Sequence, residues 1–511
     1  MVLGAQGQQG IRGTCKRWAA CTSFALLHGE ASLAERMGRV LSVLTATGIV
    51  SALIFAPLAF GAVEPWAYSV LAVLSCTALA AAAAAALVAG KVRHMAAIML
   101  LPAAAALVLV GLQYARWPVG LVRLASPRAV HIYQDAAPPG AGQALHATLS
   151  PSLYRQGTRD ALIRLSSYVA LFAAACTYAR SRKQMARLAA VIVAVGFIVS
   201  LLGILQSLSG THRLYWWREL THGGAPFGPF VSRNQFAAYA GICLFVGLGL
   251  LLARLARPAR GGAGSRLDPP GTVRKCAHQN LLLGFAASVT GAAVIWSLSR
   301  GGILALLLSL AGVLAALKAT GLVRSRLLHV GAVAVVAMGL ITYLGWEPVL
   351  RRFATLENVA RDPLGDWRWM MLRDATRIGL DFPILGTGAG TFMSVYPLYR
   401  TLPTNALAGS PHNEYVHVFA ETGFTGLAIL AAAMVLFYRR IIAALSSSKD
   451  PFVLGLIAGG IGAPLVVSFH SLVDFPMRSP AIAATLAVAA ALLYQAAGMD
   501  SAGHVRTKEP A

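Results

Sequence analysis

The chain has 511 residues, of which 57% are hydrophobic and only 12% are charged. Soluble globular domains carry about 25% charged residues, so this composition excludes an ordinary soluble enzyme and predicts an integral membrane protein. The formal net charge is +24. We assign most of it to loops beside anionic lipid headgroups, because no nucleic-acid-binding motif accompanies it. Membrane lipids are therefore expected partners, and nucleic acid is not.

Apolar runs of about 20 residues, long enough to cross a bilayer, recur along the whole chain. They predict an all-α protein with about twelve transmembrane helices. The expected spans are residues 40–63, 66–90, 95–113, 161–179, 187–208, 234–253, 279–298, 302–318, 327–345, 415–438, 452–473 and 479–497. Residues 1–38 are mixed and polar, so we expect a cytoplasmic tail there and no cleavable signal peptide. The transmembrane domain is expected over 39–497, with a second cytoplasmic tail at 498–511.

Loop charge sets the expected orientation, because basic residues favour the cytoplasmic side. With the N-terminus in the cytoplasm, the lysines of the chain all fall inside: Lys16, Lys91, Lys183, Lys275, Lys318, Lys449 and Lys508. Both termini are then cytoplasmic, and the long loops 114–160, 209–233 and 346–414 lie on the outer face. None of the six cysteines falls in an outer loop, which predicts neither a structural disulfide nor a cysteine metal site.

The loop at 346–414 contains a helical pattern. Its apolar residues Trp367, Met371, Ala375 and Ile378 recur at helical spacing, with Arg373 on the opposite face. This pattern predicts a short amphipathic helix that lies on the membrane or on the transmembrane bundle.

A glycine-rich run, Gly386-Thr387-Gly388-Ala389-Gly390, ends the predicted helix in a tight turn. No strand precedes the run, and its third glycine is one residue early for a dinucleotide fingerprint. We therefore expect the glycines to let the backbone approach a ligand or another helix closely.

His412 lies where this last outer loop re-enters the membrane. With Ser410 as N-cap and Pro411 at the first position, a helix would begin just before His412. Backbone N–H groups and the positive end of the helix dipole would then converge near the imidazole. Such an environment disfavours the imidazolium and leaves a neutral histidine that accepts a proton beside an anion site. The alternative is a helix start whose polar groups merely face lipid headgroups.

Charged side chains from five separate parts of the chain gather at the predicted outer face. They are Arg233, Arg300, Arg368, Arg373, His412, Asp474 and Arg478. Arg300 lies in a very short turn between two spans, where a charge costs energy unless it is used or well solvated. Arginine presents a planar fork of donors that suits phosphate oxygens, so this set would suit a lipid diphosphate. His417 is expected to be a packing residue, and His470 and Asp474 are expected to satisfy each other.

The same residues lie in motifs that resemble the O-antigen ligase and polymerase superfamily. The motifs are Ser232-Arg233-Asn234-Gln235-Phe236-Ala237, Ser299-Arg300-Gly301, Arg368 ahead of Pro383-Ile384-Leu385-Gly386-Thr387-Gly388, His412-Asn413-Glu414-Tyr415 with Glu421-Thr422-Gly423, and His470-Ser471-Leu472-Val473-Asp474-Phe475-Pro476. Each motif is short, but their order and their shared side of the membrane are specific together. The resemblance covers about residues 40–497.

The resemblance implies a multi-pass, GT-C-like glycosyltransferase that acts at the outer face of the cytoplasmic membrane. Its donor would be a glycan on undecaprenyl diphosphate, and an acceptor hydroxyl would displace the lipid diphosphate with inversion. Arg233 and Arg300 would hold the diphosphate, and His412 would be the base or orient the acceptor. The implied substrate-binding residues are Asn234, Arg368, Arg373, Asn413, Glu414, Glu421 and Arg478. The outer loops hold neither an Asp-x-Asp pair nor a His/Cys cluster, so we predict no metal or other cofactor.

The motifs leave the acceptor open. Ligation onto a lipid A core in lipopolysaccharide synthesis, polymerisation of repeat units of a capsule or exopolysaccharide with a chain-length regulator, and glycan transfer to protein share one donor and one reaction type. A transporter of lipid-linked sugar is a rival from another class. Transporters tend to show internal repeats and charges near the midplane. This chain shows no clear repeat and crowds its polar residues at one face, which favours an enzyme.

Overall fold

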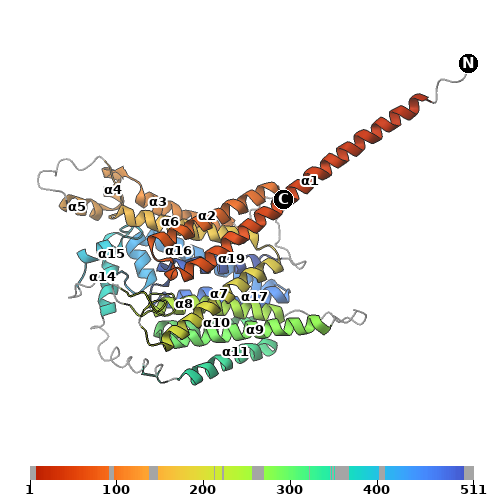
Figure 1. Ribbon diagram of the computed structural model, residues 1–511. Helices are drawn as coiled ribbons and strands as arrows, with labels where there is room; N and C mark the ends of the chain where they lie inside the picture. The colour runs from red at the N-terminus through yellow and green to blue at the C-terminus, as the bar shows by residue number, and fades with distance from the viewer. Residues whose placement is uncertain are drawn as a thin grey trace, which may run out of the picture.

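The computed structural model describes residues 7–90, 97–136, 148–211, 213–220, 224–255, 270–321, 323–345, 347, 350–351, 367–401 and 409–499. Long helices run side by side in a bundle (Figure 1). They are α1 (Gly7–Leu58), α2 (Pro65–Val88), α3 (Ala97–Tyr114), α6 (Arg155–Tyr178), α7 (Arg182–Leu208), α8 (Arg233–Leu255), α9 (Pro270–Trp296), α10 (Arg300–Ala319), α11 (Val323–Leu344), α16 (Glu414–Ser447), α17 (Pro451–Gly460), α18 (Gly462–His470) and α19 (Pro480–Ala496). The prediction of an all-α membrane protein is confirmed.

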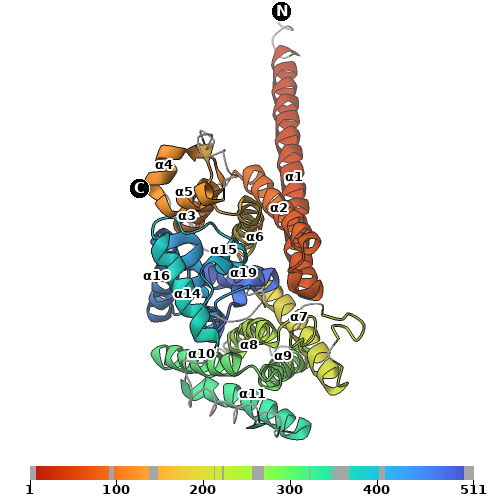
Figure 2. The ribbon, with the colours of Figure 1, turned by 90° about the vertical axis from the view of Figure 1, so that its left-hand side faces the viewer.

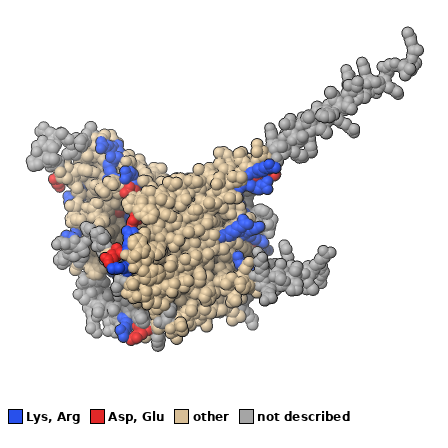
Figure 3. Space-filling view, viewed as in Figure 1, with Lys and Arg blue, Asp and Glu red and all other residues tan. Residues whose placement is uncertain are grey.

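The predicted spans coincide with these helices. Among the described residues, nine spans are long and apolar enough to cross a membrane, and α17 and α18 together form one of them. Three shorter apolar helices lie at Ile98–Tyr114, Leu328–Tyr343 and Pro480–Ala496. All twelve expected segments are therefore helical, while their number as true membrane crossings stays a prediction. On the face drawn in Figure 3, a broad band without charged residues separates the charged residues at the two ends of the bundle.

Helix α8 is the centre of the bundle. All of its apolar window is buried, and it packs against α7, α9, α17 and α18. Small residues make the closest of these contacts, as is usual between membrane helices. A Cβ atom on Gly249 would lie 2.7 Å from the carbonyl oxygen of Leu456. This packing places the first residues of α8, Arg233 and Asn234, at one end of the central helix.

Short elements cover that end of the bundle (Figures 1 and 2). They are η1 (Phe60–Ala62), β1 (Trp117–Pro118), α4 (Val119–Ala125), α5 (Pro127–Asp135), β2 (Thr148–Leu149), α14 (Trp367–Asp381), α15 (Phe392–Val395), η3 (Tyr396–Leu398) and η4 (Pro476–Arg478). Strands β1 and β2 pair antiparallel, with Trp117 opposite Leu149. We refer to this end as the site end. That it faces away from the cytoplasm stays a prediction.

Helix α14 is the predicted amphipathic helix. Met371, Ala375 and Ile378 are buried, whereas Arg373 and Arg377 are exposed. The buried stripe packs against α16, so α14 lies on the bundle, which was one of the two placements that the pattern allowed. Within the predicted loop 346–414, residues 346, 348–349, 352–366 and 402–408 lie outside the described part of the chain.

The glycines after α14 bring the backbone close to two helices. Gly386 has φ +67°, and a Cβ atom there would lie 2.2 Å from the backbone of Glu421 and Thr422 in α16. Gly390, with φ +78°, would place a Cβ atom 2.5 Å from the carbonyl oxygen of Gly157 in α6. The predicted close approach is confirmed, and its target is another helix.

Helix α16 is interrupted at Gly423, where φ is +63° and ψ is −164°. The N–H of Phe424 donates instead to the carbonyl oxygen of Pro383, at 2.7 Å. Only glycine readily adopts this conformation. The break separates a short first segment, Glu414–Thr422, from the long apolar remainder, and the first segment carries the acidic residues of the predicted site.

Candidate active site

The N-terminal ends of α8 and α10 meet at the site end of the bundle. Ser299, the N-cap of α10, accepts the N–H of Gly302 and donates to the side-chain oxygen of Asn234, at 2.8 Å. Because Asn234 is the second residue of α8, this bond joins the two helix starts. Arg233 and Arg300, the first residues of the two helices, are half-buried. Two positive dipole ends, each with an arginine as the first residue of its helix, thus lie in one region, which favours an anion.

Asp474 connects this region to His412. It lies in the connection between α18 and α19 and is only 5% exposed. Its Oδ2 accepts a hydrogen bond from the side-chain amide of Asn234. Its Oδ1 accepts the N–H of Phe475 at 2.8 Å and lies 3.5 Å from Nδ1 of His412. One carboxylate therefore holds α8 and, through Asn234, α10 on one side and the histidine on the other.

Asp474 is ionised in this environment. Burial works against its charge, but the contact with His412, the proximity of His470 and the N–H of Phe475 outweigh burial and lower the pKa of Asp474 below its ordinary value. A charged carboxylate next to Nδ1 favours the tautomer with a proton on that nitrogen. In that tautomer, Nε2 is the ring nitrogen with a free lone pair.

The backbone of His412 is strained, and its ring is held between aromatic side chains. Its φ is +54°, in the left-handed region that a non-glycine residue rarely adopts. The rings of Trp367 and Phe475 both meet the imidazole edge to face, with centroids 5.0 Å away. The side chain keeps 18% of its surface exposed. Strain of this kind clusters at functional sites, where the surrounding structure imposes it.

The predicted helix start at Ser410 and Pro411 is wrong. Helix α16 begins at Glu414, and Asn413 is its N-cap, with its side-chain oxygen accepting the N–H of Val416 at 3.0 Å. Asn413 also donates from its amide to the carbonyl oxygen of Leu472, at 2.9 Å. A serine cannot make this pair of contacts, because it has no second polar atom that reaches across. His412 thus precedes the helix, and its Nδ1 lies 3.5 Å from the Asp474 carboxylate.

The arginines of α14 lie at different distances from the histidine. The guanidinium of Arg368 lies over the ring of Trp367, 5.5 Å from its centroid, and the same ring contacts His412. Arg368 therefore contacts a residue that itself contacts His412. Arg373 is 49% exposed and donates to the hydroxyl of Thr401, at 2.7 Å. The role of Arg373 in substrate binding stays a prediction.

Arg478 forms the centre of a second, buried cluster. Its Nη2 atom donates to Oε2 of Glu421 at 2.9 Å, and its Nε lies 3.4 Å from Oε1 of Glu414. Glu421 is 3% exposed and Glu414 is 7% exposed. Burial disfavours the charged guanidinium, but the two carboxylates outweigh it and raise the pKa of Arg478 above its ordinary value. All three groups are held by one another.

The other carboxylate oxygen of Glu421, Oε1, also contacts protein groups. Its Oε1 accepts the N–H of Phe392 at 3.0 Å and lies 3.2 Å from Nε2 of His417. Nδ1 of His417 in turn lies 3.1 Å from the hydroxyl of Ser410. His417 is buried, as expected for a packing residue, but it is also a member of this polar network.

His470 and Asp474 do not satisfy each other, contrary to the expectation from sequence. The Asp474 oxygens face Asn234, His412 and the N–H of Phe475. Both ring nitrogens of His470 are buried and have no hydrogen-bond partner within the described residues. The sequence placed Asp474 at the outer face but assigned it to the wrong histidine, since four residues of spacing on one helix suggested a local pair. The similarity of residues 470–476 to a family motif was the one sequence signal that Asp474 is important.

The described residues contain no group of three or more His, Cys, Asp or Glu side chains placed to hold a metal ion. The site region brings together two helix starts with their arginines, a histidine and its carboxylate. Groups of these types suit an anion and a proton transfer at neighbouring positions.

Residues 285–431 match the model of a protein family described as O-antigen ligase. The match contains Arg300, Arg368, His412 and Glu421, so the resemblance to the O-antigen ligase and polymerase superfamily is confirmed. Arg233 and Asp474 lie outside the match and are joined to it by the three-dimensional contacts above. Over the whole chain, comparison with curated proteins finds no match.

Proposed function

We propose that this protein is an inverting membrane glycosyltransferase that transfers a glycan from undecaprenyl diphosphate to an acceptor hydroxyl at the outer face of the cytoplasmic membrane. The observation that carries the proposal is the junction of two helix starts with His412 through Asp474 and Asn234. It provides an anion site and a proton acceptor side by side. The family match supports an O-antigen ligase or polymerase type of activity in general.

The reaction that this geometry suits is a single displacement. The acceptor hydroxyl attacks the anomeric carbon of the donor glycan while Nε2 of His412 takes its proton. The bond between the anomeric carbon and the phosphate oxygen breaks, and the lipid diphosphate leaves with the electron pair. Negative charge grows on the diphosphate, so Arg233, Arg300 and the two helix dipoles stabilise the transition state more than the bound donor.

Asp474 and Arg368 support these steps in different ways. Asp474 keeps the proton on Nδ1 of His412 and stabilises the imidazolium that forms when the acceptor is deprotonated. We propose that Arg368, whose guanidinium lies over Trp367, contacts a further oxygen of the donor. Asn234 orients Asp474, and Asn413 fixes the end of α16 next to His412.

Glu414, Glu421 and Arg478 remain predicted substrate-binding residues whose roles stay untested. We propose that these three groups hold the first segment of α16 against η4 in the absence of substrate. Their contacts are already made within the protein, and a sugar hydroxyl would have to replace one of them. The acidic residues next to His412 in the sequence therefore act mainly on the geometry of the site.

The anion site is tested with Arg300→Lys. Lysine keeps the charge but loses the planar fork that binds two phosphate oxygens at once. We expect glycan transfer to fall by about two orders of magnitude, comparable to removing one preorganised donor from a transition-state site. Wild-type rates in both Arg300→Lys and Arg300→Ala proteins would exclude a diphosphate contact at this position.

The reaction is tested with purified protein in detergent, a synthetic undecaprenyl-diphosphate oligosaccharide and EDTA. Products are separated by size, and the His412→Ala protein is run alongside. Lengthened lipid-linked glycan that is absent from the variant reaction identifies a polymerase, and transfer only after lipid A core is added identifies a ligase. Activity that is lost in EDTA and restored by a divalent cation would contradict metal independence. Movement of lipid-linked glycan across vesicle membranes without transfer would favour the transporter.

A further inference from the structure

Two segments form an aromatic surface at the site end of the bundle. One is the connection between α1 and α2, and the other is the turn at residues 213–219 that follows α7. The ring of Phe60 joins them, because its centroid lies 5.5 Å from that of Tyr215 and 6.5 Å from that of Trp217, both edge to face. The aromatic surface is defined by five side chains: Phe60, Trp66, Tyr215, Trp216 and Trp217.

The indole rings of the aromatic surface are exposed, although two of their polar edges are bound. Trp66, Trp216 and Trp217 are 50%, 40% and 67% exposed. The indole N–H of Trp66 donates to Oε2 of Glu64 at 2.7 Å, and that of Trp216 donates to the hydroxyl of Ser209 at 2.9 Å. Within the described residues, no hydrogen bond involves the indole N–H of Trp217. The surface therefore presents apolar ring faces and one free donor.

The backbone that carries these rings is strained. Six non-glycine residues in the described part of the chain have positive φ, and four of them lie here: Phe60, Ala62, Tyr215 and Trp216. The hydroxyl of Tyr215 donates to the carbonyl oxygen of Leu58, at 2.6 Å. Arg218 pairs with Glu64 and lies over the ring of Phe60, 4.3 Å from its centroid. Strain persists only where the surroundings impose it, and it clusters at functional positions.

The aromatic surface continues two apolar helix faces. On α7, four exposed apolar residues recur on one face: Ile198, Leu201, Leu205 and Leu208. Ser209, which binds the indole of Trp216, follows directly after them. On α2, exposed Val70 and Val73 lie one and two turns after Trp66 on the same face. Large exposed apolar faces of this kind mark contact with lipid.

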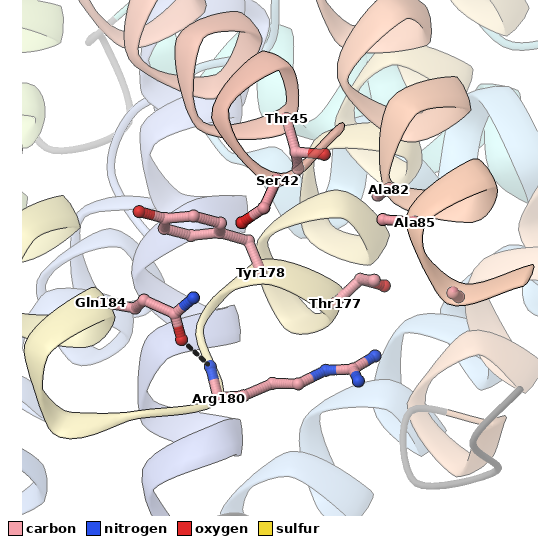
Figure 4. Close-up of a pocket in the computed structure, with 9 residues that line it drawn as sticks. Ser42, Thr45, Ala82, Ala85, Thr177, Tyr178, Arg180 and Gln184 are labelled. Atoms are coloured by element: carbon pink, nitrogen blue, oxygen red, sulfur yellow. Dashed lines mark hydrogen bonds between the residues drawn. The ribbon is translucent and has the colours of Figure 1, made fainter. Parts of the chain in front are cut away.

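The length of α2 fits a position of Trp66 at the boundary of the bilayer core. Near the other end of α2, Ala85 lines a small polar pocket together with Arg180 and Gln184 (Figure 4). Ala85 is nineteen residues after Trp66, about 29 Å along the helix at 1.5 Å per residue. The hydrocarbon core is about 30 Å thick. Polar groups thus lie at one end of an apolar length that matches the core, and Trp66 lies at the other.

The charges around the aromatic surface are paired. Arg218 pairs with Glu64, and Arg213 pairs with Glu219 at 2.5 Å. Each pair is neutral, so neither carboxylate is left to be repelled by anionic headgroups. Exposed indoles also suit the apolar face of a sugar ring, but continuity with two lipid-facing helix faces favours the bilayer. Tryptophan and tyrosine are enriched at the headgroup level, where an apolar ring with a polar edge is stable.

We propose that the aromatic surface lies in the headgroup layer of the leaflet at the site end and fixes the depth of the candidate active site. Trp217 donates its free indole N–H to lipid headgroup oxygens, and the rings of Trp66 and Trp216 lie against the first part of the acyl chains. The carbonyl oxygen of Gly61 accepts the hydroxyl of Ser479 at 3.1 Å, which connects this level to the neighbouring Arg478 cluster. The consequence for catalysis rests on the proposed function: the diphosphate of a lipid-linked donor reaches the site while its lipid tail stays in the bilayer.

Fluorescence quenching by lipid tests this placement. The full-length protein is reconstituted in vesicles of phosphatidylglycerol and phosphatidylethanolamine whose acyl chains carry bromine near the glycerol end or near the methyl end. The difference between wild type and Trp217→Phe gives the emission of Trp217. We expect bromine near the glycerol end to lower this emission by about twofold, and more than bromine near the methyl end does. Absence of quenching by either lipid, or stronger quenching from the methyl end, would overturn the proposal.

Two further variants keep this result interpretable. Trp296 is only 8% exposed, so the emission lost in Trp296→Phe should not be quenched by either lipid. Trp66→Phe should give the same depth as Trp217→Phe, and it replaces that variant if Trp217→Phe does not fold. Equal quenching of the Trp217 and Trp296 emissions would overturn the proposal. Trp217 emission that responds to an added oligosaccharide and not to brominated lipid would identify a sugar-binding surface and overturn it as well.

Matched arginine variants test the support beneath the rings. Arg218→Gln removes the ion pair next to Phe60, whereas Arg213→Gln removes a more exposed pair. We expect Arg218→Gln to reduce the quenching of Trp217 by about half and Arg213→Gln to leave it unchanged, because exposed pairs contribute little. Equal effects of the two variants would contradict a rigid support. Quenching reports lipid contact and not transfer, so its outcome is independent of whether the proposed reaction occurs.

Discussion

Two polar clusters lie at the site end of the bundle, and they differ in how far their side chains are buried and bound by other protein groups. The His412 cluster contains a strained backbone and an imidazole that is 18% exposed, with one ring nitrogen toward Asp474. The Arg478 cluster contains two carboxylates that are almost fully buried: Glu421 is bound at both oxygens, and Glu414 contacts Arg478 at 3.4 Å. The first cluster has a partly exposed imidazole, whereas the second is buried around an ion pair.

The difference follows from the cost of burying charge. An ionised group in a membrane protein interior is tolerated when partners satisfy it on every side, and such a saturated group adds rigidity. A proton acceptor needs one side fixed and one side accessible to substrate. The two carboxylates near His412 in the sequence therefore belong to the rigid cluster, while the carboxylate that fixes His412 comes from the connection between α18 and α19.

His412→Ala gives the largest expected loss of function. Removing the proton acceptor should lower the transfer rate by about 10²–10⁴-fold. The unfolding temperature should change little, because the polar contact that the side chain makes with Asp474 is long, at 3.5 Å. Transfer rate and thermal unfolding in detergent are measured on the same preparation. A large drop in unfolding temperature would show that His412 stabilises the fold, and it would contradict the difference between the two clusters.

Arg478→Ala should show the reverse pattern. It leaves Glu421 and Glu414 buried without their cation, and we expect the free energy of unfolding to fall by about 3 kcal/mol. This is the lower end of the range for a buried ion pair, because the Arg478 side chain is 26% exposed. Arg373→Ala is the matched control and should cost less than about 0.5 kcal/mol, as surface changes do. Equal effects of the two substitutions would contradict a special role for the buried cluster.

Asp474→Asn tests whether one carboxylate contributes both to the transfer rate and to the stability of the fold. The shape is kept, but the neutral amide no longer stabilises the imidazolium, and we expect the transfer rate to fall by about 10–100-fold. The folded protein lowers the pKa of Asp474, so its charge stabilises the fold above the ordinary value of about 3.9, and this contribution is lost as pH falls through the lower folded-state pKa.

Unfolding temperatures of wild type and Asp474→Asn, measured between neutral pH and pH 3, follow this contribution. The gap between the two proteins should stay constant down to about pH 4 and close below it. A gap that instead closes as pH rises would show that the pKa shift has the opposite sign.

Asn413→Ala has the smallest expected effect. Loss of the N-cap and of the contact with Leu472 should cost about 1 kcal/mol of stability. Asn413→Ser should recover part of it, since serine restores the cap oxygen and not the amide donor. Thermal unfolding of both variants is compared with wild type. An unchanged unfolding temperature in Asn413→Ala would favour a helix start at Ser410, as the sequence suggested.

Several features were predictable because they depend on neighbouring residues. The apolar runs predicted the nine long spans and the three shorter apolar helices found among the described residues, since each needs only its own composition to be stable in a bilayer. Helical spacing predicted α14, and the glycines after it predicted close backbone contact, because both are local geometric properties. The order of the spans also predicted that charged residues from separate parts of the chain lie at one end of the bundle, while the orientation of that end stays a prediction.

The pairing of polar groups was decided only by the tertiary structure. Ser410 and Asn413 are both good N-caps by residue type, and the position of Leu472 in the connection between α18 and α19 favours Asn413. Asp474 had His470 nearby in sequence, yet the packing of α8 against α18 brings Asn234 to it, and the bonds of Asn413 and Glu414 to residues 471–472 bring His412 to it. Composition and spacing determine which segments form helices and which end of the bundle is polar. The arrangement of the helices determines which buried charges meet, because each must find its partners across the bundle.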